Sequence, residues 1–176
     1  MNKLKFLLLS IFLFVTGCSS SKPTNTFEDF RCYPKAVYLI RHAEKMIIEG
    51  EKNPELTRVG INRAEALPGA LADVMPGFIY SSEYTRTQQT VAPLSKAWGR
   101  DISIKTAREP QLQIEVALSH CDQNVVIAGH SNTIPHLISL FGIQDEIYIE
   151  DNQYGDLFIV QWQEGKPSLT IEHFGE

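Results

Sequence analysis

The chain of 176 residues has few cysteines, no excess of basic residues and no long apolar run. Its three cysteines include no Cys-x-x-Cys pair, which argues against a zinc module built from paired thiolates. A formal net charge of −5 argues against a dedicated nucleic-acid-binding protein, because such proteins usually present a basic face. No apolar run reaches the roughly 18 residues that a membrane-spanning helix needs. We therefore expect no metal ion, no other cofactor and no nucleic-acid partner.

The N-terminal segment has the composition of an export signal. Lys3 and Lys5 precede an apolar run over residues 6–15, which is too short to span a bilayer as a helix. This order of basic residues, apolar run and small residues is typical of a secretory signal peptide. The residues that follow, Val15-Thr16-Gly17-Cys18, resemble the lipobox of bacterial lipoproteins.

The lipobox resemblance implies that residues 1–17 are removed and that Cys18 is lipidated. Residues 18–34 would then form a flexible tether with a serine-rich start. The protein would be a cell-envelope lipoprotein that faces the periplasm, held in the inner or the outer membrane by its N-terminal lipid. The alternatives are an ordinary signal peptide cut nearby and a buried helix.

Two further cysteines, Cys32 and Cys121, would meet an oxidising compartment in an exported protein. Each stands four residues before an apolar run, which starts at Ala36 in one case and at Val125 in the other. If these runs are neighbouring parallel strands, both thiols lie at the same end of the sheet. The sequence leaves open a Cys32–Cys121 disulfide or two buried free thiols.

Strand-like and helix-like segments alternate from residue 35 onward, which predicts a single α/β domain over residues 35–176. We expect an α/β/α layered arrangement with a mostly parallel central sheet. The turn at Gly165-Lys166-Pro167 favours an antiparallel hairpin at its C-terminal edge. The expected strands are 36–40, 78–81, 102–105, 125–128, 146–149, 156–162 and 168–173. The expected helices are 57–71, 83–98, 111–119 (with Leu112 turned inward) and 131–141.

Polar side chains follow three of the expected strands directly. Arg41-His42 follows the first, the segment Ser81 to Arg86 follows the second, and Gly129-His130 follows the strand at 125–128. Ligands of such sheets bind beyond the carboxyl ends of the strands, so we expect these side chains to share one crevice. Arginine forks and the start of a helix both bind phosphate well, and a histidine can act as a nucleophile. The pattern therefore indicates an anion site suited to phosphoryl transfer.

The same residues resemble the motifs of the histidine phosphatase superfamily, branch 1, whose fold is shared with phosphoglycerate mutase. Four elements match in order, and the resemblance covers residues 36–174. They are Arg41-His42-Ala43-Glu44-Lys45, Leu56-Thr57-x-x-Gly60, Ser81-Ser82-x-Tyr84-x-Arg86-x-x-Gln89-Thr90 and Gly129-His130-Ser131-Asn132-Thr133.

The resemblance implies a role for each matched residue. His42 would be the nucleophile that becomes phosphohistidine, and Arg41, Arg86 and His130 would complete the phosphate pocket. Ser131 would add a backbone donor. For catalysis we expect His42 to be neutral and His130 to be a cation. Taken singly, any of these residues could instead be a cap, a surface residue or a satisfied core residue.

The general acid is the weakest part of the match. An alkoxide leaving group needs a proton, usually from a carboxylic acid. Larger members of the family place a glutamate about two dozen residues after the middle arginine, and Glu109 lies 23 residues after Arg86. Glu109 is therefore the expected acid, with Glu115 as a second choice. If neither reaches the pocket, phosphoramidates and other good leaving groups become the favoured substrates.

The expected function is a metal-independent phosphatase that hydrolyses phosphomonoesters or phosphoramidates through a phosphohistidine on His42. Its partner would be a phosphorylated small molecule or a phosphohistidine protein. Two alternatives stay open: a phosphohistidine-protein phosphatase, and a non-catalytic anion-binding envelope lipoprotein on the same fold. The oligomeric state is not indicated by the sequence.

Overall fold

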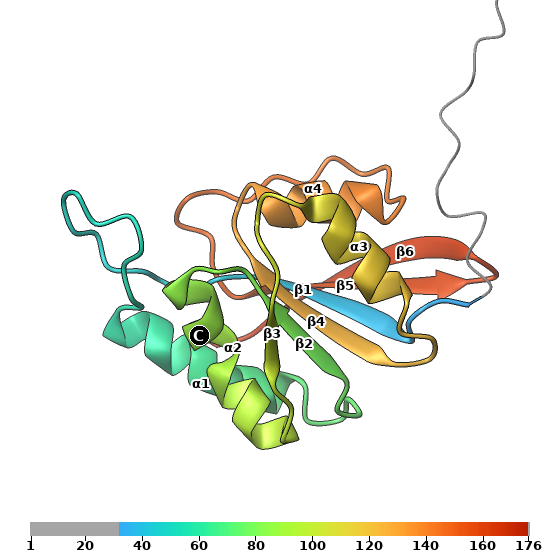
Figure 1. Cartoon of the computed structure of the whole chain (residues 1–176), viewed down its shortest axis with the longest axis horizontal. Helices are drawn as coiled ribbons and strands as arrows, with labels where there is room; N and C mark the ends of the chain where they lie inside the picture. The colour runs from blue at the N-terminus through green and yellow to red at the C-terminus, as the bar shows by residue number, and fades with distance from the viewer. Residues whose placement is uncertain (1–31, 176) are drawn as a thin grey trace, which may run out of the picture.

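A computed structural model describes residues 32–175, which form one six-stranded sheet with helices on both faces (Figure 1). The strands are β1 (Ala36–Arg41), β2 (Phe78–Ser81), β3 (Ile102–Ile104), β4 (Asn124–Gly129), β5 (Asp156–Gln163) and β6 (Lys166–His173). The helices are α1 (Arg58–Ala70), α2 (Thr85–Trp98), α3 (Pro110–Leu118) and α4 (Thr133–Leu140). The expected signal peptide, Cys18 and most of the tether lie outside the described residues.

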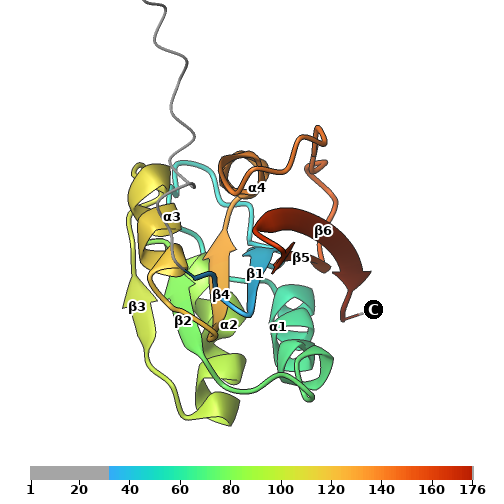
Figure 2. The ribbon, with the colours of Figure 1, turned by 90° about the vertical axis from the view of Figure 1, so that its right-hand side faces the viewer.

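The strand order is β3-β2-β4-β1-β5-β6, and the first four strands run parallel. β5 pairs antiparallel with β1, and β6 pairs antiparallel with β5 through a turn at Glu164-Gly165. The layered α/β fold with a mostly parallel sheet and an antiparallel C-terminal edge is therefore confirmed. Figure 2 shows α1 and α2 on one face of the sheet and α3 and α4 on the other.

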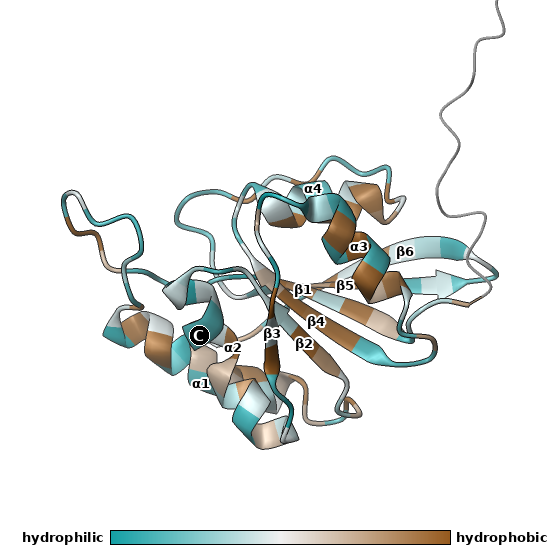
Figure 3. Cartoon of the chain, viewed as in Figure 1, coloured by the Kyte–Doolittle hydropathy of each residue, from teal (hydrophilic) through white to brown (hydrophobic). Residues whose placement is uncertain are grey.

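The two helical layers exist because β1 and β4 are buried on both faces. Val37 and Leu39 belong to the core under α3 and α4, whereas Tyr38 and Ile40 belong to the core under α1 and α2. Such double-sided burial needs near-continuous apolar strands, as the sequence has. Figure 3 shows the apolar residues gathered in the central strands, while β6 carries mostly polar residues.

Two expectations about secondary structure are wrong. The segment 146–149 forms no strand; Ile149 is buried against the core, but the backbone has no neighbouring strand with which to pair. In α3, Leu112 is 40% exposed, and the buried positions are instead Gln113, Ile114, Ala117 and Leu118. No helix among residues 32–175 has the length and apolar character to cross a membrane.

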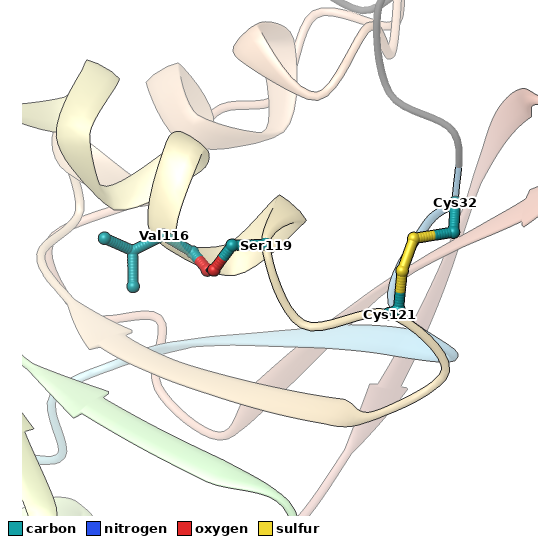
Figure 4. Close-up of a disulfide and its surroundings, with 4 residues drawn as sticks. All are labelled: Cys32, Val116, Ser119 and Cys121. Carbon is teal, nitrogen blue, oxygen red and sulfur yellow. A yellow bond between two sulfur atoms is a disulfide. The ribbon is translucent and has the colours of Figure 1, made fainter.

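A disulfide joins Cys32 to Cys121, with their Cα atoms 5.5 Å apart (Figure 4). The parallel register pairs Ala36 with Asn124, so both cysteines precede their strands at the same end of the sheet. Of the two arrangements that the sequence left open, the structure has the bridge. The disulfide fixes the segment that leads into β1, at the end of the sheet opposite to the carboxyl ends of the parallel strands.

Candidate active site

The three polar strand ends are brought together because β2, β4 and β1 are neighbours in the sheet. Just past the strands, the His42 N–H donates to the Gly129 carbonyl at 3.0 Å, and the Ser82 N–H donates to the Ala128 carbonyl at 3.2 Å. A cavity of about 380 Å³ opens at this edge. It is lined by Arg41, His42, Lys45, Glu83, Tyr84, Arg86, Ala107, Arg108, His130, Ser131, Asn132, Thr133 and Asp151.

His42 is held as a neutral imidazole with one free nitrogen. Its Nδ1 lies 2.8 Å from the Ala43 carbonyl oxygen, which only accepts, so Nδ1 carries the proton and Nε2 keeps its lone pair. The ring is 4% exposed. Burial lowers the pKa of His42 to about 3, against the opposing effect of the Ala43 hydrogen bond and with help from the nearby His130 and Arg86 charges. An unprotonated Nε2 is the form that a nucleophile requires.

His130 is oriented by a chain of hydroxyl groups. Thr87 Oγ1 donates to the Tyr84 carbonyl at 2.6 Å, so it accepts from Ser82 Oγ at 2.7 Å. Ser82 Oγ in turn accepts from His130 Nε2 at 2.9 Å. The Tyr84 ring meets the His130 ring edge to face at 5.1 Å between centroids. This chain selects the tautomer with its proton on Nε2.

The surroundings of His130 disfavour the cationic form that we expect during catalysis. Burial, followed by the Arg86 charge, lowers the pKa of His130 to about 4. The two imidazoles lie edge to face with centroids 5.3 Å apart, so charging one also disfavours charging the other. A bound phosphoryl group would act in the opposite sense, because a nearby negative charge favours the imidazolium form.

Arg86 presents two buried donors that lack a protein partner. Its Nε and Nη1 are buried and make no hydrogen bond. The guanidinium lies over the Tyr84 ring, with Cζ 4.3 Å from the ring centroid. Burial lowers the pKa of Arg86 below its usual value, and the side chain still carries its charge at neutral pH. Buried donors without partners are costly, so their presence in a cavity marks a binding position for an acceptor.

Arg41 is largely occupied by the chain itself. Its Nη1 donates to the carbonyls of Glu150 at 2.6 Å and Gln153 at 2.8 Å, and its Nη2 donates to Asp151 at 3.0 Å. Cζ also lies 4.3 Å from the Tyr154 ring centroid. Arg41 therefore fastens the segment 150–154 over the site. Its Nε is buried without a partner and remains the donor available to a ligand.

The residues after His42 are fixed by α1 and α2. The Ala43 N–H donates to Thr90 Oγ1 at 2.9 Å, and the Glu44 carbonyl accepts from the Thr57 N–H at 2.8 Å. The Glu44 carboxylate forms an ion pair with Arg63 at 2.8 Å. Gly60 allows this approach, since a Cβ there would lie 2.3 Å from the Glu44 carbonyl oxygen. The matched motifs thus include residues that position the His42 loop.

The structure does not bring Glu109 into the cavity. Glu109 is exposed at the N-cap of α3, one residue beyond Arg108, which does line the cavity. Pro110 begins the helix at that point and sets the direction of the chain. Glu115, the second choice, does not line the cavity either. Ser131 does line it, at the end of the chain segment that leads into α4.

A different carboxylate, Glu83, lines the cavity and was missed by the sequence analysis. Its Oε2 accepts from the Ala107 N–H at 2.9 Å. Glu83 stands at a variable position inside the Ser81 to Arg86 motif, so its place directly after β2 was the available signal. No group of three or more His, Cys, Asp or Glu side chains arranged for a metal ion occurs among residues 32–175.

The buried neutral histidines give the protein a specific pH dependence of stability. In the folded chain the pKa values of His42 and His130 are about 3 and about 4, below the ordinary value for histidine. Below pH 6.5 the unfolded chain therefore binds protons at these two residues that the folded chain does not bind. The free energy of unfolding should therefore fall between pH 6.5 and 5, by up to about 1.4 kcal/mol per pH unit for each histidine. Urea titrations of wild type and His130→Asn would measure this. An equal slope in both proteins would contradict the assignment.

Comparisons with known proteins agree with the fold and the motifs. The family model of the histidine phosphatase superfamily (branch 1) matches residues 37–113. A mycobacterial glucosyl-3-phosphoglycerate phosphatase in complex with VO3 has a TM-score of 0.63 at 14% identity, over 80% of this chain and 98% of that chain. The phosphoserine phosphatase of Entamoeba histolytica, in complex with 3-phosphoglyceric acid, has a TM-score of 0.60 at 16% identity. The match covers 80% of this chain and 96% of that chain.

A third similar structure is a protein from Agrobacterium tumefaciens assigned as the phosphohistidine phosphatase SixA. Its TM-score is 0.55 at 22% identity, over 80% of this chain and 97% of that chain. No curated protein sequence matches the chain. The family model covers the stretch that contains Arg41, His42 and Arg86, and the structural neighbours share the fold as a whole. The chain is therefore similar to branch 1 of the histidine phosphatase superfamily over residues 37–113, and it shares its fold with solved structures of phosphatases.

Proposed function

We propose that this protein is a phosphatase that hydrolyses phosphomonoesters through a phosphohistidine intermediate on His42, without a metal ion. The observation that carries the proposal is the pairing of a free His42 Nε2 with the unpartnered Nε and Nη1 of Arg86 in one cavity. A nucleophile and an oxyanion site are the two parts that phosphoryl transfer needs most.

The proposed reaction has two steps. In the first, His42 Nε2 attacks phosphorus in line and the bond to the leaving group breaks. Arg86 stabilises the charge on the phosphoryl oxygens, and His130 contributes as its pKa rises beside them. The Nδ1–H bond to the Ala43 carbonyl keeps the ring in place and supports the positive charge it gains. In the second step, water attacks phosphorus and the N–P bond breaks, which restores His42.

A phosphohistidine protein is the second candidate substrate. The observation in its favour is that Glu109 does not line the cavity, since an imidazole leaving group does not require protonation of an alkoxide. The similar structure from Agrobacterium tumefaciens is assigned as a phosphohistidine phosphatase. A non-catalytic anion-binding role is the alternative outcome, in which phosphate binds but no turnover occurs.

The first test is hydrolysis of para-nitrophenyl phosphate in the presence of EDTA. We expect turnover by the wild-type protein and none above background for His42→Ala, because the attacking nitrogen is lost. His173→Ala, an exposed histidine far along the chain on β6, is the matched control and should retain full activity. Turnover that persists in His42→Ala, or that disappears with EDTA, would contradict the proposal.

We also propose that the protein is exported and anchored by a lipid on Cys18, which lies outside the described residues. The support is the order of basic residues, apolar run and lipobox-like tetrad in the sequence. Incorporation of labelled palmitate that is lost in Cys18→Ser would support this localisation. Equal labelling of both proteins would contradict it.

A further inference from the structure

Two carboxylates line the cavity, Glu83 and Asp151. Both are exposed at its mouth, whereas His42 and His130 are buried at its base. In-line attack from His42 Nε2 places the leaving group on the opposite side of phosphorus, which is the side of the mouth. A group that gives a proton to the leaving oxygen must therefore come from the rim, and the rim supplies these two candidates.

Glu83 is the carboxylate tied most closely to the reacting groups. It stands between Ser82, which holds His130, and Arg86, which presents the unpartnered donors. Its negative charge acts on the His130 imidazole and on the Arg86 guanidinium. Glu83 also lines the same cavity as His130 and Arg86.

The Glu83 carboxylate is also held in place. Its Oε2 accepts the Ala107 N–H at 2.9 Å, on the segment that joins β3 to α3. That segment leads to Glu109, the expected acid, which does not line the cavity. Glu83 therefore lines the cavity from the β2–α2 connection, and its carboxylate is bonded to the segment that precedes Glu109.

Asp151 is less well placed for the same role. The structure records a bond from Arg41 to its main-chain carbonyl and none to its carboxylate. No ring or charge contact links it to His42 or His130. Lys45 and Arg108 line the same cavity.

We propose that Glu83 is the general acid and base of this phosphatase, a role that rests on the function proposed above. In the first step the His42 Nε2–P bond forms, the P–O bond to the leaving group breaks, and the Glu83 proton moves to the leaving oxygen. In the second step a water oxygen attacks phosphorus, the N–P electron pair returns to Nε2, and the water proton moves to Glu83. A substrate that binds as its monoanion supplies the proton for the first turnover.

The free protein holds Glu83 ionised, since the Ala107 N–H and other hydrogen bonds outweigh desolvation and lower the pKa of its carboxyl group. This is the form that accepts a proton from the attacking water. The negative charge of a bound phosphoryl group acts in the opposite sense and favours the protonated form that the first step uses.

The test compares leaving groups in Glu83→Gln, which keeps an oxygen to accept the Ala107 N–H. With an alkyl phosphate such as glycerol phosphate, we expect the single-turnover rate of the first step to fall by about 10²–10⁴-fold. With para-nitrophenyl phosphate, whose phenolate leaves without a proton, the fall in the first step should be only a few-fold. Glu109→Gln and Asp151→Asn are the matched controls and should keep the wild-type ratio between the two substrates.

Single-turnover labelling of His42 with para-nitrophenyl phosphate separates this proposal from the proposed function. Labelling that persists in Glu83→Gln, together with the selective loss on the alkyl ester, supports Glu83 as the acid. An equal loss in the single-turnover rate of the first step on both substrates, or a selective loss in Asp151→Asn instead, overturns the role of Glu83, while labelling of wild type leaves the phosphohistidine mechanism standing. Absence of labelling in the wild-type protein overturns both.

Discussion

Replacement of Arg86 by alanine is expected to lower kcat for para-nitrophenyl phosphate by about 10²–10³-fold, the effect of losing one oxyanion donor. The reason is the state of its guanidinium, whose Nε and Nη1 are buried without partners in the cavity. These donors are preorganised and gain their acceptors only when a phosphoryl group arrives. Steady-state kinetics at saturating substrate would measure the loss.

The same substitution should leave the fold intact. A buried charge without a partner contributes little to stability and can oppose it, so Arg86→Ala should unfold at an unchanged or slightly higher temperature. Arg86→Lys should recover only part of the activity, because an ammonium group lacks the planar fork of donors. Arg100→Ala, at an exposed position after α2, is the control. Near-normal kcat in Arg86→Ala would contradict its place in the phosphate site.

Replacement of Gly60 by alanine is expected to damage both stability and catalysis. An added Cβ would lie 2.3 Å from the Glu44 carbonyl oxygen and 3.0 Å from its amide nitrogen, so backbone must move. Overpacking of this kind costs about 1–3 kcal/mol. Because Glu44 stands two residues after His42, the displacement should also misplace His42, the proposed nucleophile, and lower kcat by about 10²-fold.

Gly69→Ala is the matched control for Gly60→Ala, because both glycines lie in α1. A Cβ at Gly69 meets nothing within 4 Å. Alanine is also the better helix former, so this variant should keep full activity and gain up to about 1 kcal/mol. Thermal unfolding and para-nitrophenyl phosphate turnover would be compared for both variants. Equal behaviour of the two variants would show that the contact with Glu44 does not limit the approach of α1.

The sequence was sufficient to predict the parallel part of the sheet and the three strand ends whose polar residues form the candidate site. Runs such as Ala36 to Ile40 and Val125 to Ala128 are apolar enough to be buried on both faces, and the side chains after them reach one edge by topology. The start of the helix at residue 57 was also predicted, and in the structure the Thr57 hydroxyl accepts from the Gly60 N–H at 3.0 Å. These features depend on local pattern and on strand order.

The remaining features depend on how distant segments meet. The bonds from Arg41 to the carbonyls of 150–153 span more than 100 residues of sequence and leave no local pattern. The neutral state of His130 follows from its burial beside Arg86, which spacing does not reveal. The distance in sequence from Arg86 predicted Glu109 as the acid. That distance does not show which way the chain turns at Pro110, where α3 begins.

The most direct test of the central claim is isolation of the phosphorylated protein. The wild-type protein would be quenched during turnover of a labelled phosphomonoester and analysed by peptide mass spectrometry. We expect an acid-labile, alkali-stable phosphoryl group on His42, and none in His42→Ala. A phosphoryl group on another residue, or turnover without any covalent adduct under conditions that trap one, would contradict a mechanism in which His42 is the nucleophile.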